Sequence, residues 1–354
     1  MTMRNVLIHG ENITGLQYLL DEKKLLGKID LVYIDPPFAT GGNFTITDGR
    51  ATTISNSKSG DLAYSDNLVG VDFIDFLRKR LVLLKKLLSE EGSIYLHIDY
   101  KIGHYVKILM DEVFGIENFR NDIARVKCNP KNFNRIGFGN LKDLILFYTK
   151  SKTPIWNEPR EKYTEKDFEN LFPKKDKYGR RYTTVPIHAP GETENGKSNQ
   201  PFRGILPPKG RHWRTDVETL ELWDKEGLIE WSSKGNPRKI IFADEREGKR
   251  VQDIWEFKDR QYPTYPTEKN SNLLDLIIKT SSKEGSIVLD CFCGSGTTLK
   301  SAHLNNRKWI GIDQSGLAIK ATRQKLENVE GDIFVAKPDY EFIELNPASR
   351  TTVA

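Results

Sequence analysis

The sequence is poor in cysteine, has no long apolar run and carries only a small excess of positive charge. Its three cysteines, Cys128, Cys291 and Cys293, are too few for a disulfide framework, and too few His or Cys residues stand nearby for a zinc site. No apolar run approaches the roughly 20 residues that cross a bilayer, and the N-terminus MTMRNVLIHG lacks the pattern of a signal peptide. These absences argue against a secreted, zinc-bound or membrane protein, and we expect a cytoplasmic one.

The overall composition is that of a globular protein with one large domain or two ordinary domains. The chain has 354 residues, of which 38% are apolar and 29% are charged, so a full-sized core can form. The net charge of +5 permits a polyanionic partner but does not require one. Charge alone therefore does not identify the partner.

Short apolar runs alternate with amphipathic stretches over residues 5 to 150, and the alternation returns from residue 270. The apolar runs include IDLVYID and GSIYLHID in the first part, and SIVLD and KWIGID in the second. Strands that alternate with helices are typical of a parallel sheet that is buried on both faces. We therefore predict an α/β fold with a doubly wound, mostly parallel sheet.

A long stretch rich in Trp, Pro, Gly and mixed charge interrupts this alternation and shows no sustained periodicity. We interpret it as an insertion that separates two halves of one sheet. The predicted division is a first core half over residues 1–150, an insertion over 151–262, a second core half over 263–335 and a C-terminal tail over 336–354.

A glycine-rich bend follows the predicted strand SIVLD, in the stretch GSIVLDCFCGSGTTLKSA. Gly294 and Gly296 would let the backbone approach a ligand closely, and Thr297 is well placed to open a helix whose free N–H groups face it. The third glycine of the dinucleotide fingerprint and the lysine of a phosphate loop are both missing. The next strand, KWIGID, ends at Asp313, where an acid can bind both hydroxyls of a ribose. The pattern favours a nucleoside ligand; the alternative is a tight turn that binds nothing.

A second motif, LVYIDPPFATGG, ends an apolar strand with Asp35, Pro36, Pro37 and Phe38. The simpler interpretation is a strand that stops at a proline-rich turn, because an acid before prolines commonly ends a strand. The functional interpretation is that a stiff turn holds a carboxylate and an aromatic ring for chemistry. The motif alone does not decide between the two.

The motifs DPPF, GSIYLHID, YPTEK, DCFCGSGTT and GID, in this order, resemble those of the amino-group DNA methyltransferases. In the matching arrangement the catalytic motif precedes the cofactor motif, and the insertion is similar to the variable region of type III modification subunits. The resemblance covers nearly the whole chain outside residues 151–262. It implies a Rossmann-like, seven-stranded sheet with an inserted target-recognition region, and S-adenosyl-L-methionine as the methyl donor.

The resemblance also implies roles for individual residues at the cofactor. Asp290 would face the methionine amino group, Asp313 the ribose, and Asn12 the adenine. Thr267 and Lys269 would lie at the methionine end. The full set of residues implied in cofactor binding is Asn12, Asp66, Thr267, Lys269, Asp290, Phe292, Gly294, Ser295, Gly296, Thr297, Thr298 and Asp313.

The acid of the DPPF motif has a mechanistic use in such an enzyme. An exocyclic amine is a weak nucleophile because its lone pair is delocalised into the base. The Asp35 carboxylate and the Pro36 carbonyl would accept its two hydrogens and stabilise the positive charge that grows on the nitrogen. Pro37 would stiffen the turn, and Phe38 would stack on a base rotated out of the duplex. Such a reaction requires no metal and no covalent enzyme intermediate.

Basic residues that suit DNA contact are concentrated between residues 120 and 142 and recur in the insertion. The candidates are Arg120, Arg125, Lys127, Lys131, Arg135 and Arg211. The alternative interpretation of this stretch is a solvated basic face. The resemblance implies double-stranded DNA as the partner, and it leaves a homodimer and a restriction nuclease as further candidates.

Two alternatives to the main functional prediction stay in view. Asp in place of Ser before the two prolines favours adenine N6 as the target, with cytosine N4 as the alternative. A non-catalytic DNA-binding protein on a methyltransferase fold is the alternative from another class, and the intact Asp35, Phe38 and glycine bend argue against it. We therefore predict site-specific methyl transfer from S-adenosyl-L-methionine to N6 of a flipped adenine, in a restriction-modification or orphan system.

Overall fold

The computed structural model divides the chain into two compact units. The core unit comprises residues 1–159 and 252–354, and the inserted unit comprises residues 160–251. The structure describes residues 3–37, 43–47, 50–52, 61–65, 71–130, 134, 136–191, 196–259, 269–329 and 337–345. Across these residues, no helix has the length and apolar character that a membrane crossing requires.

The core unit is built on one sheet, in which the structure describes nine strands. Their order across the sheet is β17 (Ile254–Trp255), β7 (Phe119–Val126), β8 (Lys142–Thr149), β6 (Leu88–Ile98), β2 (Ile29–Ile34), β18 (Ile287–Asp290), β19 (Lys308–Asp313), β1 (Asn5–His9) and β20 (Tyr340–Glu344). Neighbouring strands are parallel except where β8 pairs with β6 and β7. The predicted doubly wound, mostly parallel α/β fold is confirmed. The sheet is wider than the expected seven strands because β17 and β20 extend its two edges.

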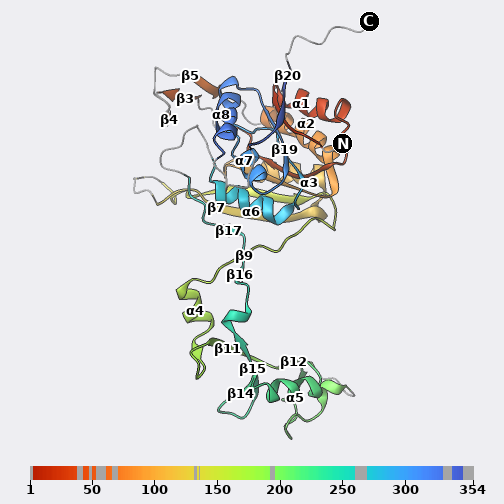
Figure 1. Ribbon diagram of the computed structural model, residues 1–354, viewed down its shortest axis with the longest axis vertical. Helices are drawn as coiled ribbons and strands as arrows, with labels where there is room; N and C mark the ends of the chain where they lie inside the picture. Colours follow the sequence, from red (N-terminus) through yellow and green to blue (C-terminus); the bar gives the residue numbers. More distant parts are fainter. Residues whose placement is uncertain are drawn as a thin grey trace. The chain divides into compact units, whose positions relative to one another are not determined.

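The helices of the core unit pack in two groups (Figure 1). The first group is α1 (Asn12–Asp21), α2 (Val71–Leu87) and α3 (Gly103–Phe114), and the short 3₁₀ helix η1 (Ile116–Asn118) follows it. The second group is α6 (Ser271–Ser281), α7 (Thr297–Leu304) and α8 (Gly316–Glu327). Apolar residues at helical spacing on α2, such as Phe73, Leu77 and Leu81, are fully buried. Because the central strands are also buried along most of their length, the two groups cover both faces of the sheet.

Smaller antiparallel sheets complete both units. In the core unit, β3 (Asn43–Thr47) lies between β4 (Arg50–Thr52) and β5 (Asp61–Ser65). In the inserted unit, the order of one sheet is β10 (Lys174–Lys175), β11 (Arg181–Pro186), β15 (Pro237–Phe242) and β14 (Ile229–Trp231). Two further pairs there are β12 (His188–Pro190) with β13 (Arg211–Trp213), and β9 (Arg160–Glu161) with β16 (Lys249–Arg250).

The inserted unit has a small core and helix caps of its own. Its helical segments are α4 (Glu165–Leu171), η2 (Lys197–Asn199), α5 (Val217–Lys225) and η3 (Ala243–Glu245). Phe202, Trp213 and Leu220 are buried together with Ile187. The Asp216 side chain caps α5 by accepting a hydrogen bond from the Thr219 N–H at 2.7 Å. The region without sequence periodicity therefore folds as short strands and capped helices around a few large apolar side chains.

Candidate active site

The acid of the DPPF motif and the acid of the glycine bend leave the sheet at the same edge. Strands β2 and β18 are parallel neighbours, with Leu31 opposite Val288 and Val32 opposite Leu289. Asp35 directly follows β2, and Asp290 is the last residue of β18. The structure therefore brings together two motifs that lie far apart in the sequence, at the edge where open α/β sheets bind their ligands.

Asp35 is a largely buried carboxylate whose two oxygens have different surroundings. Its Oδ2 lies 2.6 Å from Nζ of Lys269, and the two side chains are only 14% and 11% exposed. Its Oδ1 is buried and receives no hydrogen bond from the residues that the structure describes. On that side, Nδ1 of His97 lies 3.9 Å from Oδ1. A buried carboxylate oxygen without a donor is unusual, and it suits a ligand that brings an N–H group.

The glycine bend is held in shape by Asp290. The Asp290 Oδ1 accepts a hydrogen bond from the Phe292 N–H at 3.0 Å, and its Oδ2 accepts one from the Thr298 hydroxyl at 2.6 Å. Burial raises the pKa of Asp290 to about 7, although both hydrogen bonds oppose the rise. Gly294 and Gly296 have backbone φ angles of 50° and 75°, values that residues with a Cβ rarely adopt. The bend therefore requires glycine at both positions.

Asp313 ties the bend to the end of the next strand, β19. Its Oδ2 accepts a hydrogen bond from the Gly294 N–H and its Oδ1 accepts one from the Ser315 N–H, each at 2.9 Å. Burial raises the pKa of Asp313, and the two N–H donors oppose that rise. A Cβ at Gly296 would lie 2.8 Å from the side chain of Thr322, so no side chain fits between the bend and α8. The acid, the close bend and the start of α7 are the features that a nucleoside ligand needs.

A lysine on α8 holds two hydroxyls of the glycine bend. Lys325 Nζ donates hydrogen bonds to Oγ of Ser295 and Oγ1 of Thr297, each at 2.8 Å. Both residues were predicted to lie at the ligand, and their hydroxyls accept these hydrogen bonds from α8. The Thr298 hydroxyl, in contrast, donates a hydrogen bond to Asp290. These three side chains shape the bend, and their backbone N–H groups at the start of α7 are the groups left to face a ligand.

Asn12 and its neighbour Glu11 are bound by an arginine that the sequence analysis did not single out. Arg80 on α2 is 4% exposed, and its guanidinium donates to Asn12 Oδ1 and Glu11 Oε1, each at 2.5 Å. It also stacks on Phe76, with 3.3 Å between its guanidinium carbon and the ring centre. Phe76 in turn packs on Phe292 of the bend. The signal in the sequence is a charged residue at the helical spacing of the buried apolar positions of α2.

A buried polar cluster lies behind Asp35, and the sequence analysis did not identify it. His97, near the end of β6, is fully buried between Tyr33 of β2 and Asp143 of β8. Asp143 is also 2.5 Å from Nζ of Lys127 and 3.7 Å from Nη1 of Arg125. The only sequence signal is the histidine within the apolar run GSIYLHID.

Part of the predicted site lies outside the described residues. This applies to Phe38, Asp66 and Thr267, and to the candidate DNA contacts Lys131 and Arg135. Lys269, expected at the methionine end, is described and pairs with Asp35. Pro36 is buried directly after Asp35, and Pro37 is partly buried.

The structure changes the interpretation of the basic stretch between residues 120 and 142. Arg125 is 0% exposed on β7 and pairs with Asp259, so the prediction that it contacts DNA is wrong. The physical reason is strand alternation, which points Arg125 to the same buried side as Ile123. Lys127 is bound to Asp143, and Arg120 donates to the Ser151 carbonyl at 3.0 Å. Arg211 lies exposed on β13 of the inserted unit, where it contacts His188.

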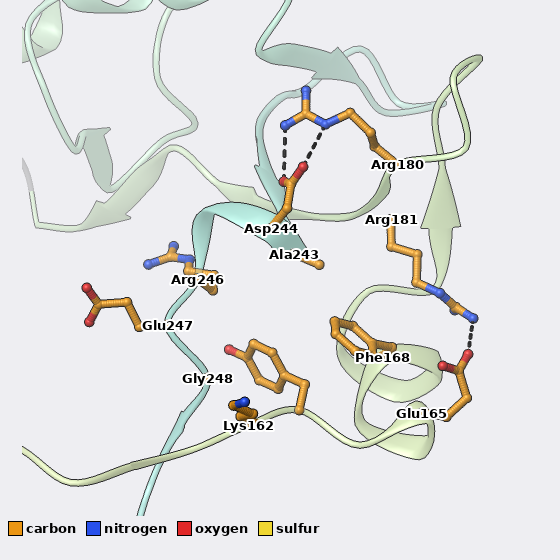
Figure 2. A pocket seen from close by; sticks show the side chains of 11 residues that line it. Lys162, Glu165, Phe168, Arg180, Arg181, Ala243, Asp244, Arg246, Glu247 and Gly248 are labelled. Carbon is orange, nitrogen blue, oxygen red and sulfur yellow. Dashed lines mark hydrogen bonds and ion pairs between the residues drawn. The ribbon is translucent and has the colours of Figure 1, made fainter. Parts of the chain in front are cut away.

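The inserted unit contains a cavity of about 650 Å³ that aromatic and charged side chains line (Figure 2). Arg180 closes one side by donating to both oxygens of Asp244, at 3.0 and 3.1 Å. Arg181 pairs with Glu165 of α4 at 2.5 Å, and Phe168 of the same helix faces the cavity between them. The two arginines are therefore already held by acids of the unit.

The chain is similar to known DNA-modifying proteins over most of its length. A family described as DNA methylase matches residues 29–324. The type II methyltransferase M.EcaI of Enterobacter cloacae is 40% identical over 331 residues, which are 92% of this chain and 70% of that protein. The type II methyltransferase M2.DpnII of Streptococcus pneumoniae is 38% identical over 91% of this chain and 89% of that protein. The StyLTI Mod subunit of a type III restriction-modification enzyme from Salmonella typhimurium is 24% identical over 83% of this chain, which spans only 49% of that subunit.

Proposed function

Because this chain belongs to the family of N6 and N4 DNA methylases, we propose that it methylates the N6 amine of a flipped adenine in duplex DNA. It is a DNA methyltransferase, with DNA as its substrate and S-adenosyl-L-methionine as its methyl donor. The choice of adenine follows from Asp35, which stands before the two prolines where Ser is the alternative. Cytosine N4 is the competing target.

The observation that carries the proposal is the buried Oδ1 of Asp35, which has no donor among the described residues. A target amine that entered here would supply the missing N–H group. Accepting that hydrogen draws the amine lone pair out of conjugation with the base and stabilises the positive charge that forms on nitrogen. Asp35 lies at the same sheet edge as the glycine bend, so the amine and the methyl donor would meet in one site.

The residues of the bend fit the methyl donor, which supplies an electrophilic methyl group on sulfur. Asp313 would accept hydrogen bonds from the ribose hydroxyls, and Asp290 would accept one from the methionine amino group. Glycine at position 296 lets the bend pack against α8, because a Cβ there would lie 2.8 Å from the Thr322 side chain. Phe292 and Asn12, with Arg80 behind them, would lie toward the adenine.

The inserted unit is proposed to read the DNA sequence, with Arg211 among its contacts. The relatives of the whole chain include a Mod subunit of a type III restriction-modification enzyme, which supports a restriction nuclease as a partner. A homodimer and a cytoplasmic location, both expected from the sequence, belong to the same proposal.

Mass spectrometry of digested DNA tests the proposal directly. The full chain is incubated with unmethylated genomic DNA and S-adenosyl-L-methionine that carries a deuterated methyl group. We expect deuterated N6-methyldeoxyadenosine, and long-read sequencing of the same DNA would report the sequence context. N4-methyldeoxycytidine in its place would overturn the adenine assignment. The Asp35→Ala variant is the control: it should transfer no methyl group while binding the cofactor within a few-fold of the wild type.

A further inference from the structure

His97 is placed to control the environment of Asp35, although it is not itself part of the DPPF motif. Its Nδ1 lies 3.0 Å from the Tyr33 hydroxyl and 3.9 Å from Asp35 Oδ1. Its Nε2 lies 3.3 Å from Asp143 Oδ2. The imidazole therefore lies between the carboxylates of Asp143 and Asp35. Its tautomer determines whether Asp35 Oδ1 faces an N–H group or a lone pair at Nδ1.

Asp143 is held in its ionised form. Although burial opposes it, the hydrogen bonds from His97 and Lys127 hold the pKa of Asp143 well below its usual range. Arg125, itself fully buried, adds a second cation 3.7 Å from Asp143 Oδ2. An ionised carboxylate can only accept hydrogen bonds, so the Nε2 of His97 must donate to it.

His97 is neutral, and its other nitrogen is therefore an acceptor. Burial lowers the pKa of His97, and the nearby cations Lys269 and Arg125 lower it further, against the opposing effects of Asp143 and Asp35. Burial raises the pKa of Tyr33, so that its hydroxyl keeps its proton and donates to Nδ1. A neutral imidazole with hydrogen on Nε2 presents only a lone pair at Nδ1.

The lone pair of His97 Nδ1 explains why Asp35 Oδ1 receives no hydrogen bond from this side, and it has no donor elsewhere among the described residues. The opposite tautomer would place an N–H group next to that oxygen and could satisfy it from inside the protein. A carboxylate oxygen that already accepts such a hydrogen bond would be a weaker acceptor for a substrate.

We propose that His97 is a positioning residue, whose tautomer, fixed by Asp143, keeps Oδ1 of Asp35 available for the target amine. The proposal rests on the proposed role of Asp35 in methyl transfer. A buried ion cluster that only stabilises the sheet would share these contacts. It would not, however, link the position of one proton to the rate of transfer.

The first test reads the tautomer in the wild-type protein and does not depend on activity. The chain has six histidines, so ¹⁵N labelling of histidine gives few signals, and a His97→Asn variant identifies those of His97. We expect the neutral form with hydrogen on Nε2 throughout the range of about pH 6 to 9. Hydrogen on Nδ1, or a charged imidazolium at neutral pH, would overturn the proposal even if the enzyme methylates adenine.

The second test changes the tautomer. In Asp143→Asn the amide N–H₂ can donate to Nε2, which moves the imidazole proton to Nδ1, next to Asp35. We expect the ¹⁵N signals to exchange and kcat to fall on the order of 10²-fold, with cofactor affinity and the KM for DNA within about threefold. Unchanged kcat with an exchanged tautomer would overturn the proposal.

Two further variants separate the tautomer from the packing of the cluster. Tyr33→Phe removes the donor to Nδ1 but leaves Asp143 in place, so the tautomer should persist and kcat should fall by about threefold or less. A tautomer change in Tyr33→Phe would show that Asp143 does not fix it, whether or not Asp143→Asn folds. Ser93→Ala, on the same strand, removes a fully buried hydroxyl that has no hydrogen-bond partner among the described residues, and should match the wild type in both readouts.

Discussion

Lys269 and Asp35 form a buried ion pair, with 2.6 Å between Nζ and Oδ2, that joins the segment before α6 to the end of β2. Both residues were predicted at the active site, Lys269 at the methionine end of the cofactor and Asp35 at the target amine. Because each side chain is less than one-sixth exposed, as the 11% and 14% values show, neither charge is well solvated. The pair therefore has a larger effect on stability than an ion pair at the surface.

Removing Lys269 should destabilise the protein by leaving the carboxylate of Asp35 buried and uncompensated. We expect Lys269→Met to lower the free energy of unfolding by about 3 kcal/mol, measured by denaturant titration. In an Asp35→Asn background the same substitution should cost much less. Equal costs in both backgrounds would contradict the pairing. Asp339→Asn is the control, since its pair with Arg4 is 76% and 60% exposed and should change stability by less than about 1 kcal/mol.

Asp313→Ala should weaken cofactor binding and leave the transfer step largely intact. The substitution removes the carboxylate that is proposed to bind the ribose. The same carboxylate accepts hydrogen bonds from the N–H groups of Gly294 and Ser315. We expect a cofactor dissociation constant higher on the order of 10-fold or more by calorimetry, with kcat at saturating cofactor within a few-fold. Glu344→Ala, which removes an exposed acid from the end of β20, should bind the cofactor as the wild type does. An unchanged affinity in Asp313→Ala would remove the ribose assignment.

Gly296→Ala should disturb the bend through both backbone strain and lack of space. The residue has φ of 75°, and its new Cβ would lie 2.8 Å from the Thr322 side chain. Gly285→Ala is the matched control because Gly285 has φ of 80° but nothing within 4 Å of a new Cβ. We expect the free energy of unfolding, measured by thermal unfolding, to fall by about 1 kcal/mol in Gly285→Ala and by at least about 2 kcal/mol in Gly296→Ala. Cofactor binding should weaken in Gly296→Ala only. Similar effects of both substitutions would mean that the bend does not need its closeness to α8.

Cofactor affinity should depend on pH through Asp290. Burial raises the pKa of this carboxyl to about 7, so below pH 7 it is mostly protonated and a poor partner for a cationic amino group. The dissociation constant of the cofactor should therefore fall by up to about tenfold per pH unit as the pH rises toward 7, and then level off. Asp290→Asn should bind more weakly and lose this dependence. A pH-independent affinity of the wild type between about pH 5.5 and 7.5 would remove Asp290 from the amino-group site.

The strands and motifs that border the site could be predicted because their signals are local. The runs that become β2, β18 and β19 are continuous and apolar, and each ends at an acid or directly before one. Parallel strands place those ends at one edge of a sheet, so Asp35, Asp290 and Asp313 could be assigned to one site before any contact was known.

The contacts behind the site could not be predicted because they depend on how distant strands pair. His97 meets Asp143 only because β6 and β8 pair antiparallel with His97 opposite Ile145. Arg125 was assigned to DNA contact because basic residues recur between residues 120 and 142, whereas the alternation of β7 buries it. The strands of the inserted unit are two to six residues long, too short to produce a visible period.

Oδ1 of Asp35 is buried and has no donor among the residues that the structure describes, and such an oxygen makes the resting protein less stable, by about 1 to 3 kcal/mol. Any substitution near Asp35 that offered Oδ1 an N–H or O–H group would restore that stability. The same substitution would occupy the place of the amine, so the protein would melt at a higher temperature and turn over more slowly. Selection for heat resistance and selection for speed should therefore favour different residues around this one atom.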